Sequence, residues 1–309
     1  MHNLGGVEQE DLQKIREYIW STCGIWFDES KDYLVENRLG GLCKSEDVKS
    51  YAELIVRAKQ STRVEEELVD CVTINETLFF RDDSPYKALQ HKVFPELIDA
   101  REETFHSKRL RIWSAACSTG QEAYSIAITL TELIPDIAAW DIEILGSDIS
   151  KAALAQAEKG AYKSFEIERG LPPEYMERYF IKGDGEWTVK DNIRRLCRFE
   201  QRNLTRPLLG AGPFDVVFCR NVAIYFTPEA RKQLFDRIAD TMADDGYLFV
   251  GSSECLQNLG FNPQHHCHSV FYRPALDSQP RADDAEREQG NQCDSEYIQE
   301  KTRFHHLVE

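Results

Sequence analysis

The sequence predicts an α/β protein in which an all-helical region precedes a parallel sheet with crossover helices. Three observations predict this class. Residues 1–75 show helical spacing of apolar side chains and almost no strand signal. From residue 110 onward, short apolar runs alternate with helical stretches, which is the order that a parallel sheet requires. A chain of 309 residues is also long enough for two domains.

The first 75 residues form the predicted helical domain. Apolar residues recur three and four positions apart, as at Leu12 and Ile15 and again at Val64 and Leu68. A connecting segment follows and ends at Ser84-Pro85, a helix cap and a first-turn proline that open a helix running to about residue 103. We expect the second domain to span residues 76–274.

The second domain contains the alternating elements. Apolar runs predict strands, and the stretches between them predict helices beginning near residues 121, 151 and 228. Ser150 and Gly160 limit the second of these helices to residues 151–159, because they are a typical cap and a typical stop. The predicted strands are 110–116, 142–148, 214–219, 247–253 and 269–274.

About 50 residues separate the helix at 151–159 from the next predicted strand, too many for a simple connection. Gly183-Asp184-Gly185 is a turn signal within them, and the runs on either side are rich in Tyr, Phe, Trp and Val. The sequence therefore predicts a small inserted antiparallel β-subdomain at about residues 170–203.

Composition and charge exclude several classes of function. The chain has 37 Lys and Arg against 53 Asp and Glu, a net charge of −16, which argues against nucleic-acid binding and against an anionic membrane surface. No apolar run is long enough to cross a bilayer and the first residues do not resemble a signal peptide, so we expect a cytoplasmic protein.

The nine cysteines include no C-x-x-C pair and are interpreted as reduced thiols. Residues 275–309 hold 4 basic and 9 acidic residues, and we expect a disordered acidic tail.

The loop at residues 116–122 joins the first strand to a helix through small residues. Such a loop lets the backbone approach a ligand closely. It lacks the G-x-G-x-x-G spacing of dinucleotide-binding folds, and Glu122 would repel a pyrophosphate. The pattern favours a nucleotide-like ligand without phosphates, although an ordinary tight turn would also explain it.

Polar residues also end the next two strands. Asp148 ends the second strand, where a carboxylate can accept hydrogen bonds from both hydroxyls of a ribose, although a plain helix cap is an equal alternative. The third strand leads into Arg220, Asn221 and Tyr225 at the carboxyl edge of the sheet, where a buried structural cluster is the alternative. Taken with the preceding loop, these residues favour an adenosyl group lying across the strand ends.

Five separated motifs resemble, in order and spacing, the CheR family of chemotaxis-receptor methyltransferases, and the match runs from about residue 10 to 274. The motifs are NETLFFR (75–81), RIWSAACSTGQEAYS (111–125), GSDIS (146–150), FCRNVAIYF (218–226) and GSSE (251–254). The resemblance implies a Rossmann-like sheet typical of S-adenosylmethionine-dependent methyltransferases, with the helical domain in front and the β-subdomain inserted. It implies methyl transfer from S-adenosylmethionine to the γ-carboxylate of glutamates in chemoreceptor cytoplasmic helices, with S-adenosylhomocysteine as product.

The resemblance also assigns site residues. It places Tyr225 near the transferred methyl group, and Arg81 and Tyr225 are the candidates to orient the acceptor. The chain departs from the family pattern at Gln121, Ala123 and Ser252, none of which is assigned to the cofactor. The implied cofactor-binding residues are Asn75, Thr77, Arg81, Glu122, Asp148, Asn203, Leu204, Arg220 and Asn221.

Two features bear on receptor binding. The family is thought to dock acidic receptor helices on a basic helix, yet residues 1–75 hold 9 basic and 15 acidic residues, so Lys31, Arg38 and Lys44 would supply a reduced version. Family members that grip a receptor C-terminal peptide tend to carry a longer glycine-containing loop in the β-subdomain. The short turn at residues 183–185 therefore predicts an enzyme that works without such a tether. Separately, we expect the enzyme to be a monomer.

Other interpretations compete with this one. A CheR-like module could bind S-adenosylmethionine or its demethylated product as a signal and methylate nothing. An NAD-dependent oxidoreductase is disfavoured by the missing glycine spacing. A nucleic-acid methyltransferase is disfavoured by the charge and by Arg-Asn-Val in place of an Asn-Pro-Pro-Tyr type motif. A metal site at residues 265–268 (HHCH), with His305 and His306, is disfavoured because adjacent side chains cannot all reach one ion, so no metal is expected.

Overall fold

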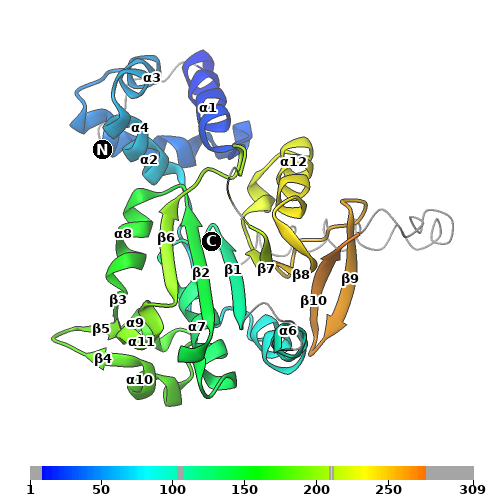
Figure 1. Ribbon diagram of the computed structural model, residues 1–309. Helices are drawn as coiled ribbons and strands as arrows, with labels where there is room; N and C mark the ends of the chain where they lie inside the picture. Colours follow the sequence, from blue (N-terminus) through cyan, green and yellow to red (C-terminus); the bar gives the residue numbers. More distant parts are fainter. Residues whose placement is uncertain (1–8, 103–107, 209, 211, 276–309) are drawn as a thin grey trace. The chain divides into compact units, whose positions relative to one another are not determined.

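The structure is a computed structural model that describes residues 9–102, 108–208, 210 and 212–275. The chain divides into two units, residues 1–274 and residues 275–309. Within the first unit, four helices precede an α/β domain (Figure 1). The acidic tail predicted at 275–309 lies outside the described residues except for Ala275, and so do His305 and His306.

The N-terminal helices pack around their own apolar core, as their sequence periodicity predicts. Ile15, Leu39 and Leu68 are fully buried in this core. The carboxylate of Asp11 in the first helix accepts hydrogen bonds from the backbone N–H groups of Tyr51 and Ala52, at 2.6 and 2.8 Å, and so caps the third helix. The helices are α1 (Gln9–Cys23), α2 (Asp32–Ser45), α3 (Tyr51–Gln60) and α4 (Thr62–Val72).

The second part is built on a seven-stranded sheet with the order β6-β2-β1-β7-β8-β10-β9 (Figure 1). The first five strands in that order run parallel, and β10 pairs antiparallel with both β8 and β9. The strands are β1 (Arg109–Ala115), β2 (Asp141–Asp148), β6 (Cys197–Gln201), β7 (Phe214–Cys219), β8 (Met242–Val250), β9 (Phe261–His266) and β10 (Ser269–Pro274). This arrangement confirms the predicted fold class.

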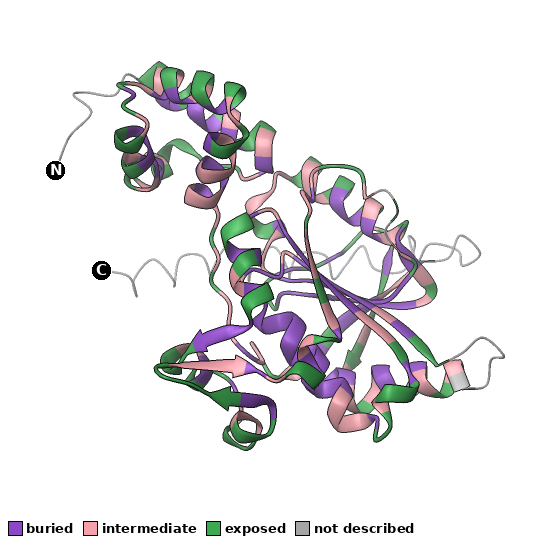
Figure 2. Cartoon of the chain, turned by 60° about the vertical axis from the view of Figure 1, so that its left-hand side comes forward, coloured by how far each residue is buried: buried purple, intermediate pink, exposed green. Residues whose placement is uncertain are grey.

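Helices cover both faces of the sheet, and alternate side chains of each strand enter different cores. Phe218 packs with residues of η2 (Leu89–Val93) and α7 (Gln121–Leu133), whereas Val217 packs with residues of α12 (Pro228–Ala239). The strands are therefore mostly buried (Figure 2). The helical run before β1 also includes α5 (Ser84–Ala88) and α6 (Phe94–Glu102), with Ser84 inside α5 rather than capping it.

Helix α8 (Lys151–Lys159) has the predicted limits. The Ser150 side chain accepts a hydrogen bond from the N–H of Ala153 at 3.1 Å, and Gly160 ends the helix in the left-handed conformation with φ 60°. β8 begins five residues earlier than the apolar run 247–253 indicates, because Met242 already pairs with Phe214 of β7 and an irregularity in the ladder separates this pair from that of Val216 and Tyr247.

The second sheet is antiparallel and has three strands in the order β3-β5-β4, with a hairpin turn at residues 183–185. Its limits differ from the predicted 170–203. The sheet begins at β3 (Ala161–Lys163) and ends with β4 (Phe180–Lys182) and β5 (Glu186–Val189), whereas β6 pairs with β2 in the large sheet. Periodicity alone cannot assign a strand to a sheet, because pairing is decided by contacts distant in sequence. The short helices here are α9 (Ser164–Glu168), α10 (Pro173–Tyr179) and α11 (Asp191–Arg194).

Candidate functional site

A pocket of about 870 Å³, counted with its open mouth, lies at the carboxyl ends of β1, β2 and β7. Its walls also include the segment that joins the helical domain to the sheet and the end of α1. Every site residue predicted from the sequence lines this pocket: Asn75, Thr77, Arg81, Glu122, Asp148, Asn203, Leu204, Arg220, Asn221 and Tyr225.

The loop after β1 has the strained backbone that often occurs at ligand sites. Ala116 and Ser118 have positive φ values of 59° and 51°, which residues other than glycine rarely adopt. Gly120 follows with a φ of 94°. The Ser118 N–H donates to the carboxylate of Asp148 at 2.8 Å, and its hydroxyl donates to the carbonyl of Asn75 at 2.9 Å. The loop is thereby tied to two other walls of the pocket.

Asp148 binds the backbone at the start of two loops that line the pocket. Its two carboxylate oxygens accept backbone N–H groups of Ser118 and Ser150, at 2.8 and 2.9 Å. Burial raises the pKa of the Asp148 carboxyl, and these backbone hydrogen bonds oppose the rise. Each oxygen has a second lone pair, so the carboxylate holds the loop and can still accept hydrogen bonds from a ligand.

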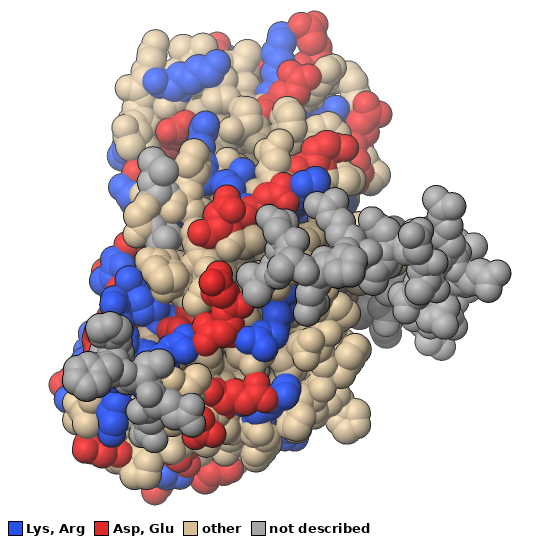
Figure 3. Space-filling model, turned by 45° about the vertical axis from the view of Figure 1, so that its right-hand side comes forward, with Lys and Arg blue, Asp and Glu red and all other residues tan. Residues whose placement is uncertain are grey.

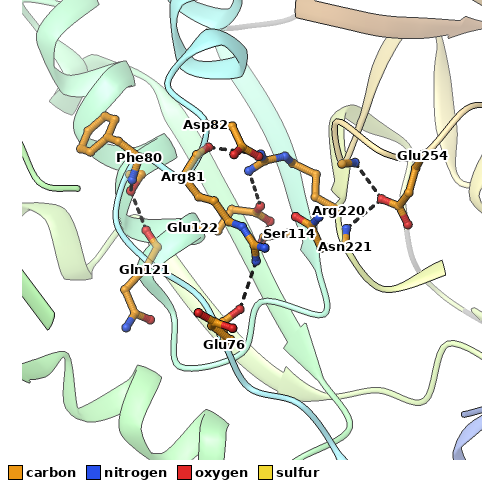
Figure 4. A network of polar contacts seen from close by, with 12 residues as sticks. Glu76, Phe80, Arg81, Asp82, Ser114, Gln121, Glu122, Arg220, Asn221 and Glu254 are labelled. Carbon is orange, nitrogen blue, oxygen red and sulfur yellow. Dashed lines mark hydrogen bonds and ion pairs between the residues drawn. The ribbon is translucent and has the colours of Figure 1, made fainter. Parts of the chain in front are cut away.

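Arg220 joins the end of β7 to the connecting segment (Figure 4). Its guanidinium lies 2.6 Å from a carboxylate oxygen of Asp82 and 3.3 Å from one of Glu122. Burial raises the pKa of Glu122, and the positive charge of Arg220 opposes that rise. The other oxygen of Glu122 accepts a hydrogen bond from the Ser114 hydroxyl at 2.7 Å.

The segment around Arg81 is held in an unusual conformation. Phe80, Asp82 and Asp83 all have positive φ, and the carbonyl of Arg81 accepts a hydrogen bond from Arg220 at 3.1 Å. The Arg81 guanidinium donates to the carbonyl of Glu76 at 3.1 Å. From its sequence context alone, Arg81 resembles a surface charge, but the structure makes it part of the pocket wall.

The helical domain contributes directly to the pocket, which the sequence did not indicate. Cys23 and Ile25 line it, and the N–H of Trp26 donates to the carbonyl of Tyr225 at 2.9 Å. The amide of Asn203 donates to the carbonyl of Thr22 at 2.7 Å, so this predicted cofactor residue also binds the end of α1. No periodicity signal could have placed the end of α1 here.

Tyr225 ends a short 3₁₀ turn after β7 (Ala223–Tyr225). Burial raises the pKa of its phenol, and the positive charges of Arg81 and Arg38 oppose that rise. The phenol therefore stays protonated at neutral pH and can donate a hydrogen bond.

Glu254 is the last residue of the GSSE motif (251–254). Its carboxylate is buried and accepts hydrogen bonds from the backbone N–H groups of Asn221, Ala223 and Gly251, at 2.7, 3.0 and 2.7 Å (Figure 4). The motif and the turn that carries Asn221 are thus directly connected.

Within the described part of the chain, no cluster of three or more His, Cys, Asp or Glu side chains is arranged to hold a metal ion. His265 and His266 are successive residues of β9, so their side chains point to opposite faces. The described part also contains no helix that is long and apolar enough to cross a membrane. Eight of the nine cysteines are described, and all eight are free thiols.

The polar and apolar groups that line the pocket fit an adenosyl cofactor that carries an amino acid group. It offers the buried carboxylates Glu122 and Asp148 for amino and hydroxyl groups, and apolar side chains such as Ile149 and Val222 for a flat base. Two buried carboxylates beside the start of α7 oppose a phosphate. The strand order, with one antiparallel strand inserted near the edge, and this pocket define an S-adenosylmethionine-dependent methyltransferase.

Comparison with known proteins gives the family. The family model described as CheR methyltransferase, all-alpha domain, matches residues 10–73, and the model described as CheR methyltransferase, SAM binding domain, matches residues 75–269. The chain belongs to the CheR methyltransferase family.

Curated relatives agree with this assignment. The chain is 42% identical to chemotaxis protein methyltransferase 1 of Pseudomonas aeruginosa over 262 residues, which cover 83% of this chain and 93% of the relative. It is 40% identical to chemotaxis protein methyltransferase Cher2 of Pseudomonas putida, with the same coverage. It is 36% identical to the chemotaxis protein methyltransferase of Vibrio parahaemolyticus, over 82% of this chain and 92% of the relative.

Proposed function

We propose that this enzyme transfers a methyl group from S-adenosylmethionine to the γ-carboxylate of glutamates in the cytoplasmic helices of chemoreceptors. The observation that carries the proposal is the pocket, because residues from separate sequence motifs line one cavity together with Arg81 and Tyr225. Membership of the CheR family and the relatives' activity in chemotaxis support it.

The residues present suit a reaction that needs no general base. A glutamate side chain has a reference pKa of about 4.3, so the acceptor is already ionised at neutral pH. When bound, S-adenosylmethionine supplies a methyl group on a positively charged sulfur, which is a strong electrophile. What the protein must supply is position, and good orientation is worth up to ~7 to 11 kcal/mol of such a barrier.

Arg81 and Tyr225 are proposed to supply that position. A protonated Tyr225 phenol can donate a hydrogen bond to the acceptor carboxylate, and Arg81 adds a positive charge on the same pocket. The Arg81 guanidinium is partly used on the Glu76 carbonyl, which limits a bidentate grip that would weaken the carboxylate as a nucleophile.

The proposed cofactor contacts follow the walls of the pocket. Asp148 would accept from the ribose hydroxyls, and Glu122 would face the amino acid end. Asn221 and Leu204 would contact the remainder of the adenosyl group, with Asn75 and Thr77 closing the pocket from the connecting segment.

The acceptor helix is proposed to approach α2, although the basic residues there are few. Arg38 acts electrostatically on Tyr225, which places its charge near the pocket, but its guanidinium also donates to the Val72 carbonyl at 2.6 Å. Lys31 pairs with Asp28 at 3.3 Å, whereas Lys44 is exposed. The face of the molecule in Figure 3 shows acidic and basic side chains intermixed, with no extended basic surface for nucleic acid.

The proposal is tested with S-adenosylmethionine carrying a tritiated methyl group and membranes that contain chemoreceptors. Methyl esters of glutamate are labile in base, so the expected product is volatile tritiated methanol. The matched control uses receptors whose candidate glutamates are replaced by alanine. Binding of S-adenosylhomocysteine without any methanol from several receptors would instead indicate a non-catalytic binding module.

A further inference from the structure

The buried carboxylate of Glu254 holds two backbone turns from outside the pocket. Glu254 follows β8 and does not line the pocket. One of its oxygens accepts N–H groups from both Asn221 and Gly251, and the other accepts the N–H of Ala223. A single side chain therefore binds the turns that follow two neighbouring strands, β7 and β8.

The carboxylate restrains the turn after β7. Asn221 has a φ of 58°, in the left-handed region, which asparagine adopts more readily than other residues that carry a side chain. The carboxylate holds this residue and Ala223, which begins the 3₁₀ turn that ends at Tyr225. Releasing Glu254 would free the segment that presents both Asn221 and Tyr225 to the pocket.

The space around Glu254 is also closed to a larger residue at position 251. A Cβ atom added to Gly251 would lie 2.8 Å from a carboxylate oxygen of Glu254 and 2.8 Å from the side-chain nitrogen of Asn221. A side chain at position 251 would therefore displace the Glu254 carboxylate or the Asn221 amide from these positions. Gly251 and Glu254, the two ends of the GSSE motif, form one arrangement.

We propose that Glu254 is a positioning residue for methyl transfer, which acts through the backbone of residues 221–223 to place Asn221 for the cofactor and Tyr225 for the acceptor. This inference rests on the proposed function for its effect on turnover. Its effect on cofactor binding does not depend on the identity of the acceptor.

The test compares Glu254→Gln with two controls. Glutamine has nearly the same size, but its amide nitrogen cannot accept from a backbone N–H, so at least one of the three hydrogen bonds is lost. Glu229→Gln removes a carboxylate from an exposed position in the first turn of α12. Phe261→Leu creates a defect in the core beneath β9 and reports the effect of lowered stability alone.

Calorimetry with S-adenosylhomocysteine and turnover per correctly folded enzyme are measured well below each melting temperature. We expect Glu254→Gln to weaken S-adenosylhomocysteine binding by about tenfold, with a similar fall in kcat, and both controls to stay within about twofold of wild type. A double-mutant cycle with Asn221→Ala is expected to be non-additive for binding, because Glu254 acts through Asn221.

Binding and kcat within about twofold of wild type in Glu254→Gln, or losses equal to those of Phe261→Leu at the same fall in melting temperature, would overturn the proposal. If Glu254→Gln does not fold, Gly251→Ala tests the same arrangement from the other side and is expected to show the same paired losses. Additive effects with Asn221→Ala would also count against it. If wild-type enzyme binds S-adenosylhomocysteine but methylates no receptor, the proposed function fails, and the binding data still decide the role of Glu254.

Discussion

The guanidinium of Arg220 lies 2.6 Å from the carboxylate of Asp82, and this contact fastens the segment that carries Arg81 to the end of β7. The Asp82 side chain is 40% exposed, so its ion pair contributes little stability by itself. The second partner, Glu122, is buried. Loss of the Arg220 charge would therefore lower stability more through Glu122 than through Asp82. Arg220 therefore has two effects. It holds the segment that carries Arg81, and it compensates the charge of the buried Glu122 carboxylate.

Replacing Arg220 by methionine is expected to destabilise the fold by about 3 kcal/mol, because Glu122 is left buried without its ionic partner. Urea unfolding of the variant and of wild type measures the difference. Asp82→Asn is the matched control, since it removes the exposed partner and is expected to cost under ~1 kcal/mol. Equal losses in the two variants would contradict the assignment of the buried pair as the dominant one.

The same pair predicts a pH dependence. Burial raises the pKa of Glu122 in the folded protein above its ordinary value of 4.5. The stabilisation that comes from this raised pKa is fully present below pH 4.5. It is lost as the pH rises through the pKa of the folded protein. Removing Arg220 raises that folded pKa further. Wild type and Arg220→Met lose this stability equally until the pH reaches the folded pKa of Glu122 in wild type. Above that pH the destabilisation of Arg220→Met relative to wild type should grow, and a constant or shrinking difference there would show that Glu122 is not the group involved.

Asp148→Ala is expected to weaken binding of S-adenosylmethionine and S-adenosylhomocysteine by ~1 to 3 kcal/mol, because the ribose hydroxyls lose their acceptor. Calorimetry measures the change. Since Asp148 also accepts the N–H of Ser118 and of Ser150, part of the effect will come from a loosened loop.

Ser150→Ala is a control that leaves both backbone hydrogen bonds to Asp148 in place. It removes the side-chain cap of α8 and should cost about 1 kcal/mol of stability while leaving cofactor affinity unchanged. Wild-type affinity in Asp148→Ala would remove this residue from the cofactor site.

Local signals predicted much of the fold. Ser150 and Gly160 limited α8 correctly because caps and left-handed stops depend on the residues themselves. The apolar runs of β1, β2 and β7 were found because these strands are buried on both faces. The strands β6 and β9 were not predicted, and residues 197–201 were included in the β-subdomain. Each strand lies at an edge of the sheet, where exposed residues weaken the pattern and pairing depends on distant residues.

The candidate site was predictable only in part. Residues at strand ends, such as Asp148 and Asn221, follow from the rule that ligands bind at the carboxyl edge of a parallel sheet. Arg81 came from the family resemblance, since nothing in its own segment indicates that Arg220 draws its backbone toward the sheet. The three hydrogen bonds to Glu254 could not be predicted, because they depend on how two turns meet in space.

Tyr225→Phe is expected to lower kcat by up to about tenfold and to leave the affinity for S-adenosylhomocysteine unchanged, because one hydrogen bond to the acceptor is lost while the ring still fills its place. Methanol release and calorimetry are measured on the same preparations. Tyr175→Phe, in α10 and outside the pocket, is the matched control and should resemble wild type in both measurements. A weaker S-adenosylhomocysteine affinity in Tyr225→Phe would place the phenol on the cofactor instead of the acceptor.

The hairpin between β4 and β5 leads to a prediction about receptor recruitment. The turn is tight, since the N–H of Gly183 donates to the carbonyl of Glu186 at 2.8 Å and Gly185 has a φ of 84°. No extended loop is available there to enclose a peptide. Of the two acidic residues in the turn region, Glu186 is paired with Lys159 at 2.9 Å. The repulsion of an acidic peptide therefore comes mainly from Asp184.

We therefore expect this enzyme to methylate receptors without a C-terminal tether. Calorimetry with a pentapeptide from the receptor C-terminus should give no binding at micromolar concentration, and receptors that lack this peptide should be methylated at the wild-type rate. The control titrates S-adenosylhomocysteine into the same sample to show that the enzyme is folded. Micromolar binding that disappears on substitution of Gly183 and Gly185 by valine would show that even this short turn takes part in holding a peptide, and the prediction would be wrong.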